Sequence, residues 1–255
     1  MATLTRTSFQ GVTNIVRFNW HFYVLSAGAV GLFWMVARFT PYPYGALAML
    51  AAIAILVPTL VSLGVSYYVY DRSDLYSLNW LGDLAIPKNA QLLTINAGFD
   101  ETSALLAQRF PQAILHVYDF YDPAKHTEIS IKRARNAYLA YPGTQPMSTA
   151  HIPLPDDFID VAFLILAAHE IRNETERITF FNELRRTLRP DGLVVVVEHL
   201  RDPPNFGAYT VGFMHFQSKN TWLTTFNQSG FLLVRERKIT SFISAFFLQK
   251  NGYTT

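Results

Sequence analysis

Between Trp20 and Tyr70 the only formal charge is Arg38, and the rest of this stretch is predominantly apolar. Arg38 divides the stretch into two runs, residues 20–37 and 46–69. A helix of about 20 apolar residues crosses the roughly 30 Å hydrocarbon layer of a bilayer, so each run is long enough to span it. Tyrosines and tryptophans stand near the ends, where interfacial aromatic residues gather. The sequence therefore predicts two transmembrane helices joined by the loop RFTPYPYG.

A cleavable signal peptide and a buried helical hairpin are the alternatives for this region. A signal peptide has one shorter apolar region, which favours the membrane interpretation. The leading tail carries Arg6 and Arg17 and no acidic residue, whereas the loop carries Arg38 alone. Basic residues stay preferentially on the cytoplasmic side, so we expect an integral protein of the cell inner membrane with both termini in the cytoplasm.

Charge and small residues indicate which partners to expect. Residues 1–75 hold 4 basic and 2 acidic side chains, out of 21 and 19 in the chain, so the remainder is electrically neutral. A neutral domain without a cluster of basic residues predicts no nucleic-acid partner. The expected partners are the lipid bilayer and a second copy of the chain, packed through small residues of the first span. These residues are Ala27, Gly28 and Gly31.

The chain divides into a tail with two spans (1–70), a juxtamembrane connector (71–90) and an α/β domain (91–255). In the connector, apolar residues indicate a short amphipathic piece that lies on the membrane surface or caps the sheet; they are Leu75, Leu78, Trp80 and Leu81. After residue 91, strand-like and helical patterns alternate, and apolar strands such as LVVVV are typical of a parallel sheet covered on both faces. Two final strand-like runs, GFLLVRERKIT and SFISAFFLQK, have no helix between them and predict an antiparallel hairpin.

The stretch LLTINAGFDETS has the strand, turn and helix order of a nucleotide-binding loop. The strand covers residues 91–97, the turn contains Gly98, and a helical pattern follows over residues 102–110. Where such loops repeat glycine at every second position, this chain has Asn96, Gly98 and Asp100. Asparagine is the best non-glycine residue for a left-handed backbone, so we interpret the loop as a modified ligand site.

Several segments together resemble the class I S-adenosylmethionine-dependent methyltransferases over residues 88–250. HIPLPDDFIDVAF is similar to the stretch leading into that family's fourth strand, FFNELRRTLRPDGLVVVVEH to its helix, turn and fifth strand, and GFLLVRERKIT to its terminal hairpin. VEHLRD followed by FMHFQS resembles members that act on quinones, thiols and other small lipophilic acceptors. The resemblance implies a doubly wound, Rossmann-like sheet of seven strands, with S-adenosylmethionine as cofactor.

The resemblance also implies which residues hold the cofactor. The acidic residue that commonly ends the family's first strand is replaced by Thr94. Asp100 and Glu101 either supply the missing countercharge for the cofactor's ammonium and sulfonium, or are first-turn acids of the helix, with Asp100 or Thr102 as its N-cap. The expected cofactor-binding residues are Asn96, Ala97, Gly98, Asp100, Glu101, Asp119, Ser148 and Thr149.

Asp119 ends the second strand 21 positions after Gly98, close to the spacing of about 20 at which an acid reaches ribose hydroxyls in this kind of fold. Asp122 is the second choice, and both have an alternative as turn acids before Pro123. By resemblance, Ser148 and Thr149 occupy the region that meets adenine, unless they are only loop residues.

Methyl transfer is an in-line displacement that needs alignment of the acceptor and, for a hydroxyl or thiol, a base. The sequence places His199 and His169 after strands at the ligand-binding end of the sheet, and His215 follows in a phenylalanine-rich segment. We expect catalytic roles in the order His199, His215, His169, although each has a structural alternative. With no cysteine and no histidine pair at helical spacing, we expect no metal site.

The leading hypothesis is a membrane-anchored methyltransferase for a small lipophilic acceptor with a hydroxyl, thiol or quinone-like group. The alternative is a non-catalytic methyltransferase-like membrane scaffold that has lost its cofactor, which the altered loop favours. An enzyme that uses another nucleotide cofactor is a third possibility, against which the antiparallel terminal hairpin argues.

Overall fold

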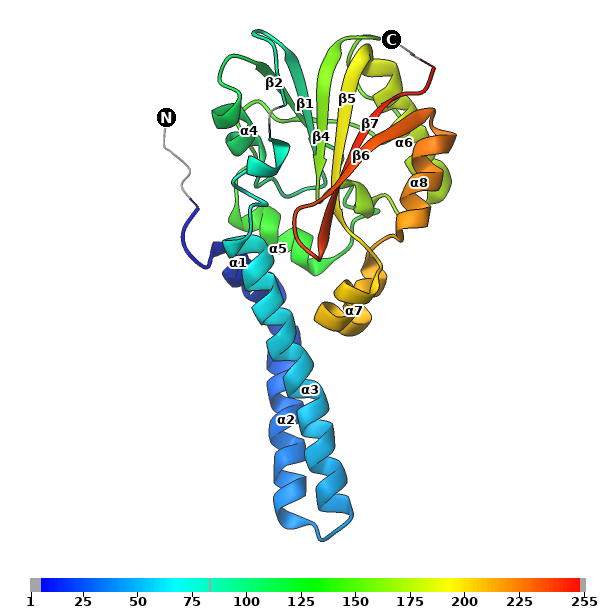
Figure 1. Ribbon diagram of the computed structural model, residues 1–255. Coiled ribbons are helices and arrows are strands. Elements are labelled where there is room, and N and C mark those ends of the chain that lie inside the picture. Colours follow the sequence, from blue (N-terminus) through cyan, green and yellow to red (C-terminus); the bar gives the residue numbers. More distant parts are fainter. Residues whose placement is uncertain (1–5, 83, 253–255) are drawn as a thin grey trace.

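The computed structural model describes residues 6–82 and 84–252 and contains one seven-stranded sheet in the order β3-β2-β1-β4-β5-β7-β6 (Figure 1). β1 to β5 run parallel, and β7 pairs antiparallel with both β5 and β6. The strands are β1 Gln91–Asn96, β2 Ile114–Asp119, β3 Gln145–Pro146, β4 Ile159–Ile165, β5 Leu188–His199, β6 Phe231–Lys238 and β7 Ile243–Lys250. The predicted doubly wound α/β sheet with a terminal antiparallel hairpin is confirmed.

Two hydrophobic cores cover the two faces of the sheet, which explains why the central strands are apolar on both sides. On one face, α6 (Glu174–Thr187) and α8 (Lys219–Gln228) bury phenylalanines and Trp222. On the other face, α4 (Ser103–Arg109) buries Leu106 beside the connector. Asn173 caps α6, because its side chain accepts a 2.9 Å hydrogen bond from the Glu176 backbone N–H.

The connector belongs to the domain core and does not lie on a membrane surface. Four of its apolar side chains are at most 2% exposed and pack against the sheet, and they are Leu75, Leu78, Trp80 and Leu81. The Trp80 indole N–H donates to the Leu75 carbonyl oxygen at 3.0 Å, which satisfies its buried polar atom. Of the two interpretations of this segment, the structure shows the one in which it covers the sheet.

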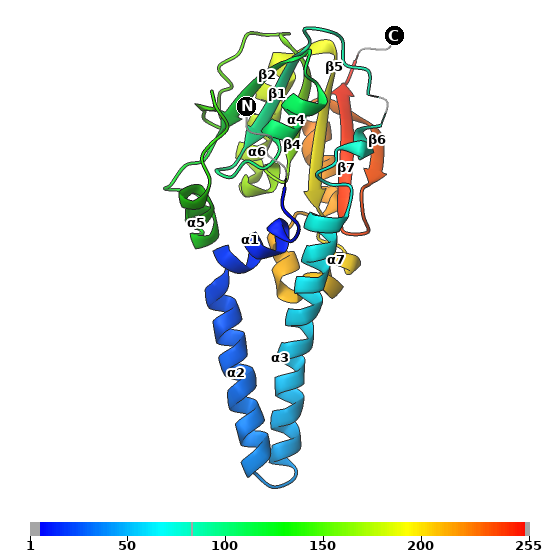
Figure 2. The ribbon, with the colours of Figure 1, turned by 90° about the vertical axis from the view of Figure 1, so that its left-hand side faces the viewer.

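Residues 20–67 form a helical hairpin that projects from the domain (Figures 1 and 2). α2 (Trp20–Phe39) and α3 (Tyr44–Tyr67) pack against each other, and a π-helical turn (Tyr68–Arg72) leads into the domain. Both helices are long and apolar enough to cross a membrane; α2 buries none of its residues, and α3 buries only Gly45, Ala48, Ala52 and Ser66. The bounds differ from the predicted 20–37 and 46–69 by two residues at three of the four ends.

The small residues of the first span do not mediate packing within the hairpin. A Cβ added at Gly28 or Gly31 would meet no atom within 4 Å among the described residues. The buried positions of α3 include Ala48 and Ala52 instead. Association of two copies through these helices therefore stays a prediction.

A further helix, α1 (Gln10–Phe18), lies in the segment predicted as a tail. It crosses the base of the hairpin next to the domain (Figure 2) and buries Gly11, Asn14 and Phe18. Its first turn is anchored by Asp71, whose carboxylate accepts hydrogen bonds from the backbone N–H groups of Gly11 and Val12 at 2.6 and 2.8 Å. The carboxylate thus satisfies two helix N-terminal donors that lack partners within the helix.

Candidate active site

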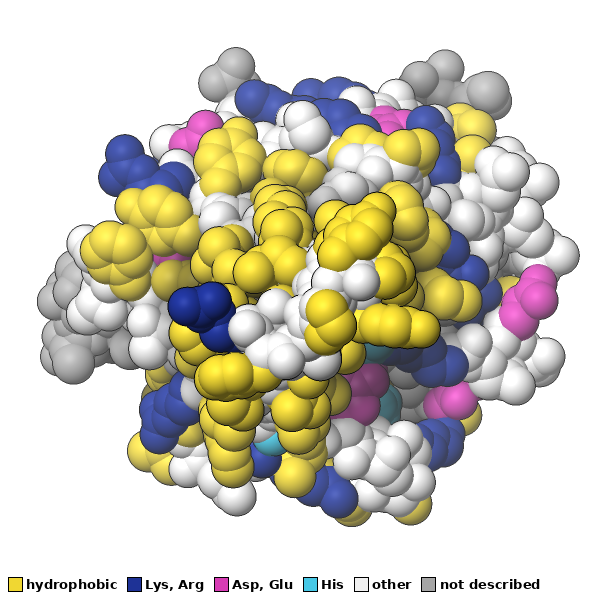
Figure 3. All heavy atoms as spheres, turned by 90° about the horizontal axis from the view of Figure 1, so that it is seen from below, with side chains coloured by type: hydrophobic (Ala, Val, Ile, Leu, Met, Phe, Trp, Pro, Cys, Tyr) yellow, Lys and Arg dark blue, Asp and Glu magenta, His cyan; other side chains and the backbone are white. Residues whose placement is uncertain are grey.

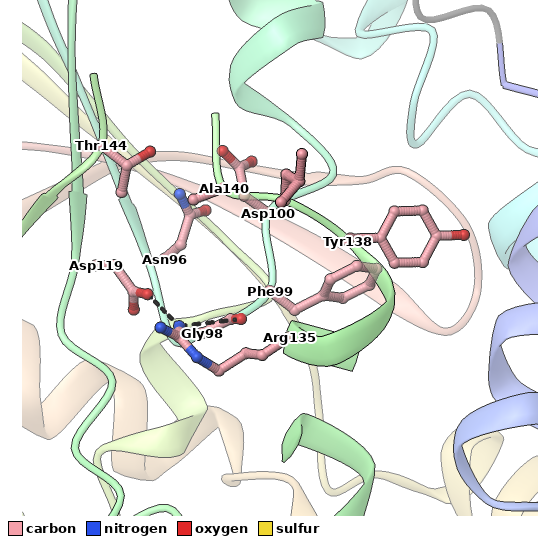
Figure 4. Close-up of a pocket in the computed structure, with 10 residues that line it drawn as sticks. Asn96, Gly98, Phe99, Asp100, Asp119, Arg135, Tyr138, Ala140 and Thr144 are labelled. Carbon is pink, nitrogen blue, oxygen red and sulfur yellow. Dashed lines mark hydrogen bonds and ion pairs between the residues drawn. The ribbon is translucent and has the colours of Figure 1, made fainter. Parts of the chain in front are cut away.

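A cavity of about 160 Å³ lies at the carboxyl end of β1, between the turn at Gly98 and α5 (Ile129–Ala137). Its lining includes Asn96, Gly98, Asp100 and Asp119 (Figure 4). Gly98 has φ +94°, and a Cβ there would stand 2.8 Å from Tyr121 Cδ2. Only glycine fits this turn. Four of the predicted cofactor-binding residues thus line one cavity.

Two polar atoms of this cavity have no hydrogen-bond partner among the described residues. They are Asn96 Nδ2 and Asp100 Oδ2, and both are buried. The other oxygen of Asp100 accepts from the backbone N–H groups of Thr102 and Ser103 at 2.9 Å each, so Asp100 caps α4 as one interpretation predicted. Buried polar atoms are rarely left unpaired, which indicates that a ligand with an acceptor and a donor fits between them.

Arg135 of α5 enters the cavity and was missed by the sequence reasoning. Its guanidinium forms an ion pair with Asp119 and a 3.3 Å hydrogen bond to the Gly98 carbonyl oxygen (Figure 4). The second Asp119 oxygen accepts from the Tyr121 backbone N–H at 2.8 Å. Asp119, the predicted ribose-binding acid, therefore lies at the end of β2 as expected, and the Arg135 guanidinium is its present partner.

Glu101 joins the Gly98 turn to the N-terminal segment. Its carboxylate pairs with Arg6 at 2.7 Å and accepts from the Tyr76 hydroxyl at 2.7 Å. Burial, together with the nearby Glu101 charge, raises the pKa of Tyr76 well above its ordinary value, so this hydroxyl stays protonated. Glu101 lines a second and a third cavity, of about 270 and 420 Å³. Ala97 is buried in the core.

A second cavity of about 270 Å³ adjoins the first, and the two share Asn96 and Phe99 in their walls. One wall comes from α1 and the end of the hairpin, with Ile15, Phe18 and Tyr70. The opposite wall contains His169, Glu170 and His215. Polar groups at the carboxyl edge of the sheet thus face a wall built by α1 and the base of the hairpin.

His169 and His215 come together although they are far apart in the sequence. His169 and Glu170 belong to a 3-10 turn after β4 (Ala168–Glu170), and His215 ends another one (Thr210–His215). The His169 Nδ1–H donates to Glu198 Oε2 at 2.7 Å, and Nε2 lies 3.3 Å from Glu170 Oε1. The His215 Nε2 lies 3.6 Å from the same Glu170 oxygen. These three residues offer grouped ligand atoms, and the expectation of no metal site stays a prediction.

Electrostatics determine the protonation of this group. Burial alone would lower the pKa of His169, but the neighbouring Glu198 and Glu170 raise it to about 10. Burial favours the neutral form of Glu170, but hydrogen bonds to His169 and His215 hold its pKa well below the ordinary value. His169 is therefore a cation at neutral pH in this arrangement and does not accept a proton.

His199, the first choice for catalysis, lies outside the lining of the three described cavities. Its Nε2 accepts from the Tyr70 hydroxyl at 2.8 Å, and its Nδ1 contacts the Asn205 Oδ1 at 3.0 Å. Burial lowers its pKa to about 4. The structure thus places His199 as a neutral link between the hairpin and β5, and its catalytic role stays a prediction.

Ser148 and Thr149 also lie outside these cavity linings. The Thr149 hydroxyl donates to Glu176 Oε1, and Ser148 forms an isolated bridge with His151. Their adenine-binding role is therefore a prediction that this arrangement does not support. The second choice for the ribose acid, Asp122, accepts from the Ala124 backbone N–H, as expected of a turn acid.

Residues 93–196 match the family model of a methyltransferase domain. This range extends from β1 into β5 and contains the Gly98 turn, Asp119 and His169. This part of the chain is thus similar to methyltransferase domains, and the seven-stranded sheet has the Rossmann-like methyltransferase fold. No curated protein gives a significant match to this chain.

Solved structures of methyltransferases share its fold. Human N-acetylserotonin methyltransferase, in complex with S-adenosylmethionine, has 15% identity and a TM-score of 0.55, with 98% of this chain and 72% of that chain covered. A complex of the Haloferax volcanii Trm112 methyltransferase activator with a putative methyltransferase has 12% identity and a TM-score of 0.51, with 72% of this chain and 92% of that chain covered. Mitomycin 7-O-methyltransferase has 15% identity and a TM-score of 0.51, with 97% and 74% covered. At these identities the likeness shows the fold alone.

Proposed function

We propose that this protein is a membrane-anchored enzyme that moves a methyl group from S-adenosylmethionine to a small lipophilic acceptor carrying a hydroxyl, thiol or quinone-like group. The observation that carries the proposal is the pair of adjoining cavities, one at the Gly98 turn and one between the sheet edge and α1. An in-line transfer requires that donor and acceptor meet, and the shared residues Asn96 and Phe99 mark where they would do so.

The residues of the first cavity fit the cofactor. Asp100 Oδ2 is free to accept from an ammonium group, and Asn96 Nδ2 is free to donate to a carboxylate. Asp119 offers acceptor oxygens for ribose hydroxyls once Arg135 releases it. S-adenosylmethionine supplies an activated methyl group, and this chain's residues would position it and exclude water.

The hairpin supports anchoring in a bilayer. Seen from the hairpin tip, apolar side chains cover the projecting helices, and acidic and histidine side chains are recessed beside them (Figure 3). α2 has 20 residues and would be about 30 Å long, which matches the hydrocarbon thickness. An acceptor dissolved in the membrane would then reach the second cavity along α1.

Titration calorimetry of the full chain in detergent with S-adenosylmethionine tests the cofactor site. Asp119→Ala is expected to weaken binding at least about tenfold, because charged hydrogen bonds contribute about 1.5–3 kcal/mol. Arg135→Gln is expected to tighten binding by up to about fivefold, because a partly exposed ion pair that competes with ribose is worth at most about 1 kcal/mol. Asp122→Ala is the matched control and should bind as the parent does. Equal affinity in the parent and Asp119→Ala would remove Asp119 from the site.

Single introduced cysteines test the orientation of the protein in the membrane, because the chain has no cysteine of its own. Tyr42 lies in the loop between the spans, and Asn251 is exposed at the far end of the domain. In intact spheroplasts, a membrane-impermeant maleimide is expected to label Tyr42→Cys, and to label Asn251→Cys only after lysis. Labelling of Asn251→Cys without lysis would place the domain outside the cytoplasm.

The non-catalytic scaffold is a second candidate because two arginines form ion pairs with two of the predicted cofactor-binding acids. Arg135 pairs with Asp119, and Arg6 pairs with Glu101. If neither S-adenosylmethionine nor S-adenosylhomocysteine binds to the parent or to Arg135→Gln, the scaffold interpretation replaces the enzymatic one.

A further inference from the structure

The second cavity contains a compact set of nitrogen and oxygen donors that has the composition of a metal site. One ligand atom each of His169, Glu170 and His215 lies within 4.8 Å of the other two. Two imidazoles and one carboxylate are a ligand set used by catalytic zinc sites, in which a fourth position stays open. The group lies at the carboxyl edge of the sheet, where ligands bind in open α/β sheets.

Glu198 provides a second, independent feature of such a site. It is fully buried, and its carboxylate accepts from both the Nδ1–H and the backbone N–H of His169, at 2.7 and 3.1 Å. Metal-binding histidines almost always donate their other ring N–H to a carboxylate, a backbone carbonyl or water, which fixes the tautomer and orientation of the ring. Here the hydrogen bond leaves Nε2 facing the Glu170 carboxylate.

We propose that His169, Glu170 and His215 bind a divalent transition-metal ion, with an open coordination position toward the second cavity. Zn²⁺ is the probe of choice because it accepts nitrogen and carboxylate ligands and a four-coordinate geometry. The absence of cysteine from the chain argues for an open site of this kind and against a closed structural one.

Arg172 is the group that a metal ion would displace. Its Nη2 lies 2.6 and 2.7 Å from the two ring nitrogens of His215 and 3.9 Å from carboxylate oxygens of Glu170 and Glu128. The Arg172 side chain is 41% exposed, and its Nη1 also donates to the His215 carbonyl oxygen, so a metal ion would have to displace the guanidinium from the imidazole. A cation held in this place by the protein itself indicates that the surrounding field favours positive charge.

The role of the ion, unlike the site itself, rests on the proposed methyl transfer. A hydroxyl or thiol bound at the open position would lose its proton to solvent more readily, because a metal ion stabilises the anion. The oxygen or sulfur anion would then bond to the methyl carbon while the carbon–sulfur bond of the sulfonium breaks and its electron pair stays on sulfur. The site therefore favours acceptors that ionise at oxygen or sulfur.

Metal titration of the full chain tests the site directly. The protein is purified in detergent with a tag free of histidine, stripped with EDTA and titrated with ZnCl₂ by calorimetry, while Co²⁺ absorption reports the geometry. We expect one ion per chain, and at least about tenfold weaker binding in His215→Ala and Glu170→Gln. Glu198→Gln, a positioning variant, is expected to lose about 10- to 100-fold. Arg172→Ala is expected to bind Zn²⁺ more tightly than the parent does.

The control is His151→Ala. His151 is an exposed histidine 3.2 Å from Glu183, and it does not belong to the group of candidate metal ligands found among the described residues. Its zinc affinity should equal that of the parent. Zinc binding that is absent, or equal in the parent and His215→Ala, would overturn the proposal. S-adenosylmethionine titrations of the same preparations separate the two ideas, since zinc binding without cofactor binding would retain the metal site and reject the methyl-transfer role.

Discussion

Acidification from pH 7 to pH 4 is expected to lower the free energy of unfolding by about 3 kcal/mol through His199 alone. Burial lowers the pKa of His199 to about 4, whereas an unfolded histidine titrates near 6.5. Between these values the unfolded chain takes up a proton that the folded chain does not, so stability falls as the pH falls. Above about pH 6.5 both states are neutral at this residue, and its contribution is constant.

The contacts of His199 explain why the folded state retains the neutral ring. The Asn205 Nδ2 donates to Asp202 and to the Phe242 carbonyl oxygen, so its Oδ1 faces His199 as an acceptor for Nδ1–H. Nε2 must then accept from the Tyr70 hydroxyl. A second ring proton would face the Tyr70 hydroxyl and would have no acceptor except this oxygen.

Denaturation curves in detergent at pH 7 and pH 4, followed by tryptophan fluorescence, measure this effect. His199→Gln should lose about 3 kcal/mol of the pH dependence while it retains polar contacts to Tyr70 and Asn205. His151→Gln is the control, because His151 is exposed and its replacement should leave the pH dependence unchanged. If the parent and His199→Gln lose equal stability on acidification, the buried neutral histidine is not the cause.

Elements with strong local patterns were predictable from the sequence. Continuous apolar runs indicated β4 and β5, and the absence of a helical pattern between the last two runs indicated the β6–β7 hairpin. Weak sequence signals explain why other elements of the structure were not predicted. β3 has two residues and offers no period, and α8 has its buried Trp222 and Phe226 at helical spacing in a segment that was read only for its motifs. α1 lies in the segment predicted as a tail, where the basic residues indicate orientation in a membrane but not secondary structure.

The candidate site was predictable only where one local segment builds it. The strand, turn and helix order gave Gly98 and Asp100, and a fixed spacing gave Asp119. Arg135 and Arg6 enter from α5 and from the N-terminal segment, so no local pattern connects them to the turn. The grouping of His169 with His215 depends in the same way on the path of the chain after β5.

Gly98→Ala is expected to weaken S-adenosylmethionine binding at least about tenfold, because the turn that shapes the first cavity cannot keep its form. At φ +94° a side chain is strained by about 1–3 kcal/mol. The added Cβ would also stand 2.8 Å from Tyr121 Cδ2 and 3.1 Å from Ile131 Cγ2, so the turn must move away from Tyr121. Such a shift displaces the Gly98 carbonyl oxygen that Arg135 contacts and alters the space between Asn96 and Asp119.

Gly143→Ala separates the effect of strain from the effect of shape. Gly143 has φ +85°, and a Cβ there would meet no atom within 4 Å among the described residues. Both variants should lose a similar amount of stability to backbone strain, but only Gly98→Ala should lose cofactor affinity in calorimetric titrations of the full chain. Equal affinities in the two variants would mean that the Gly98 turn does not contact the cofactor, whereas a loss confined to Gly98→Ala would tie the strand, turn and helix segment directly to cofactor binding.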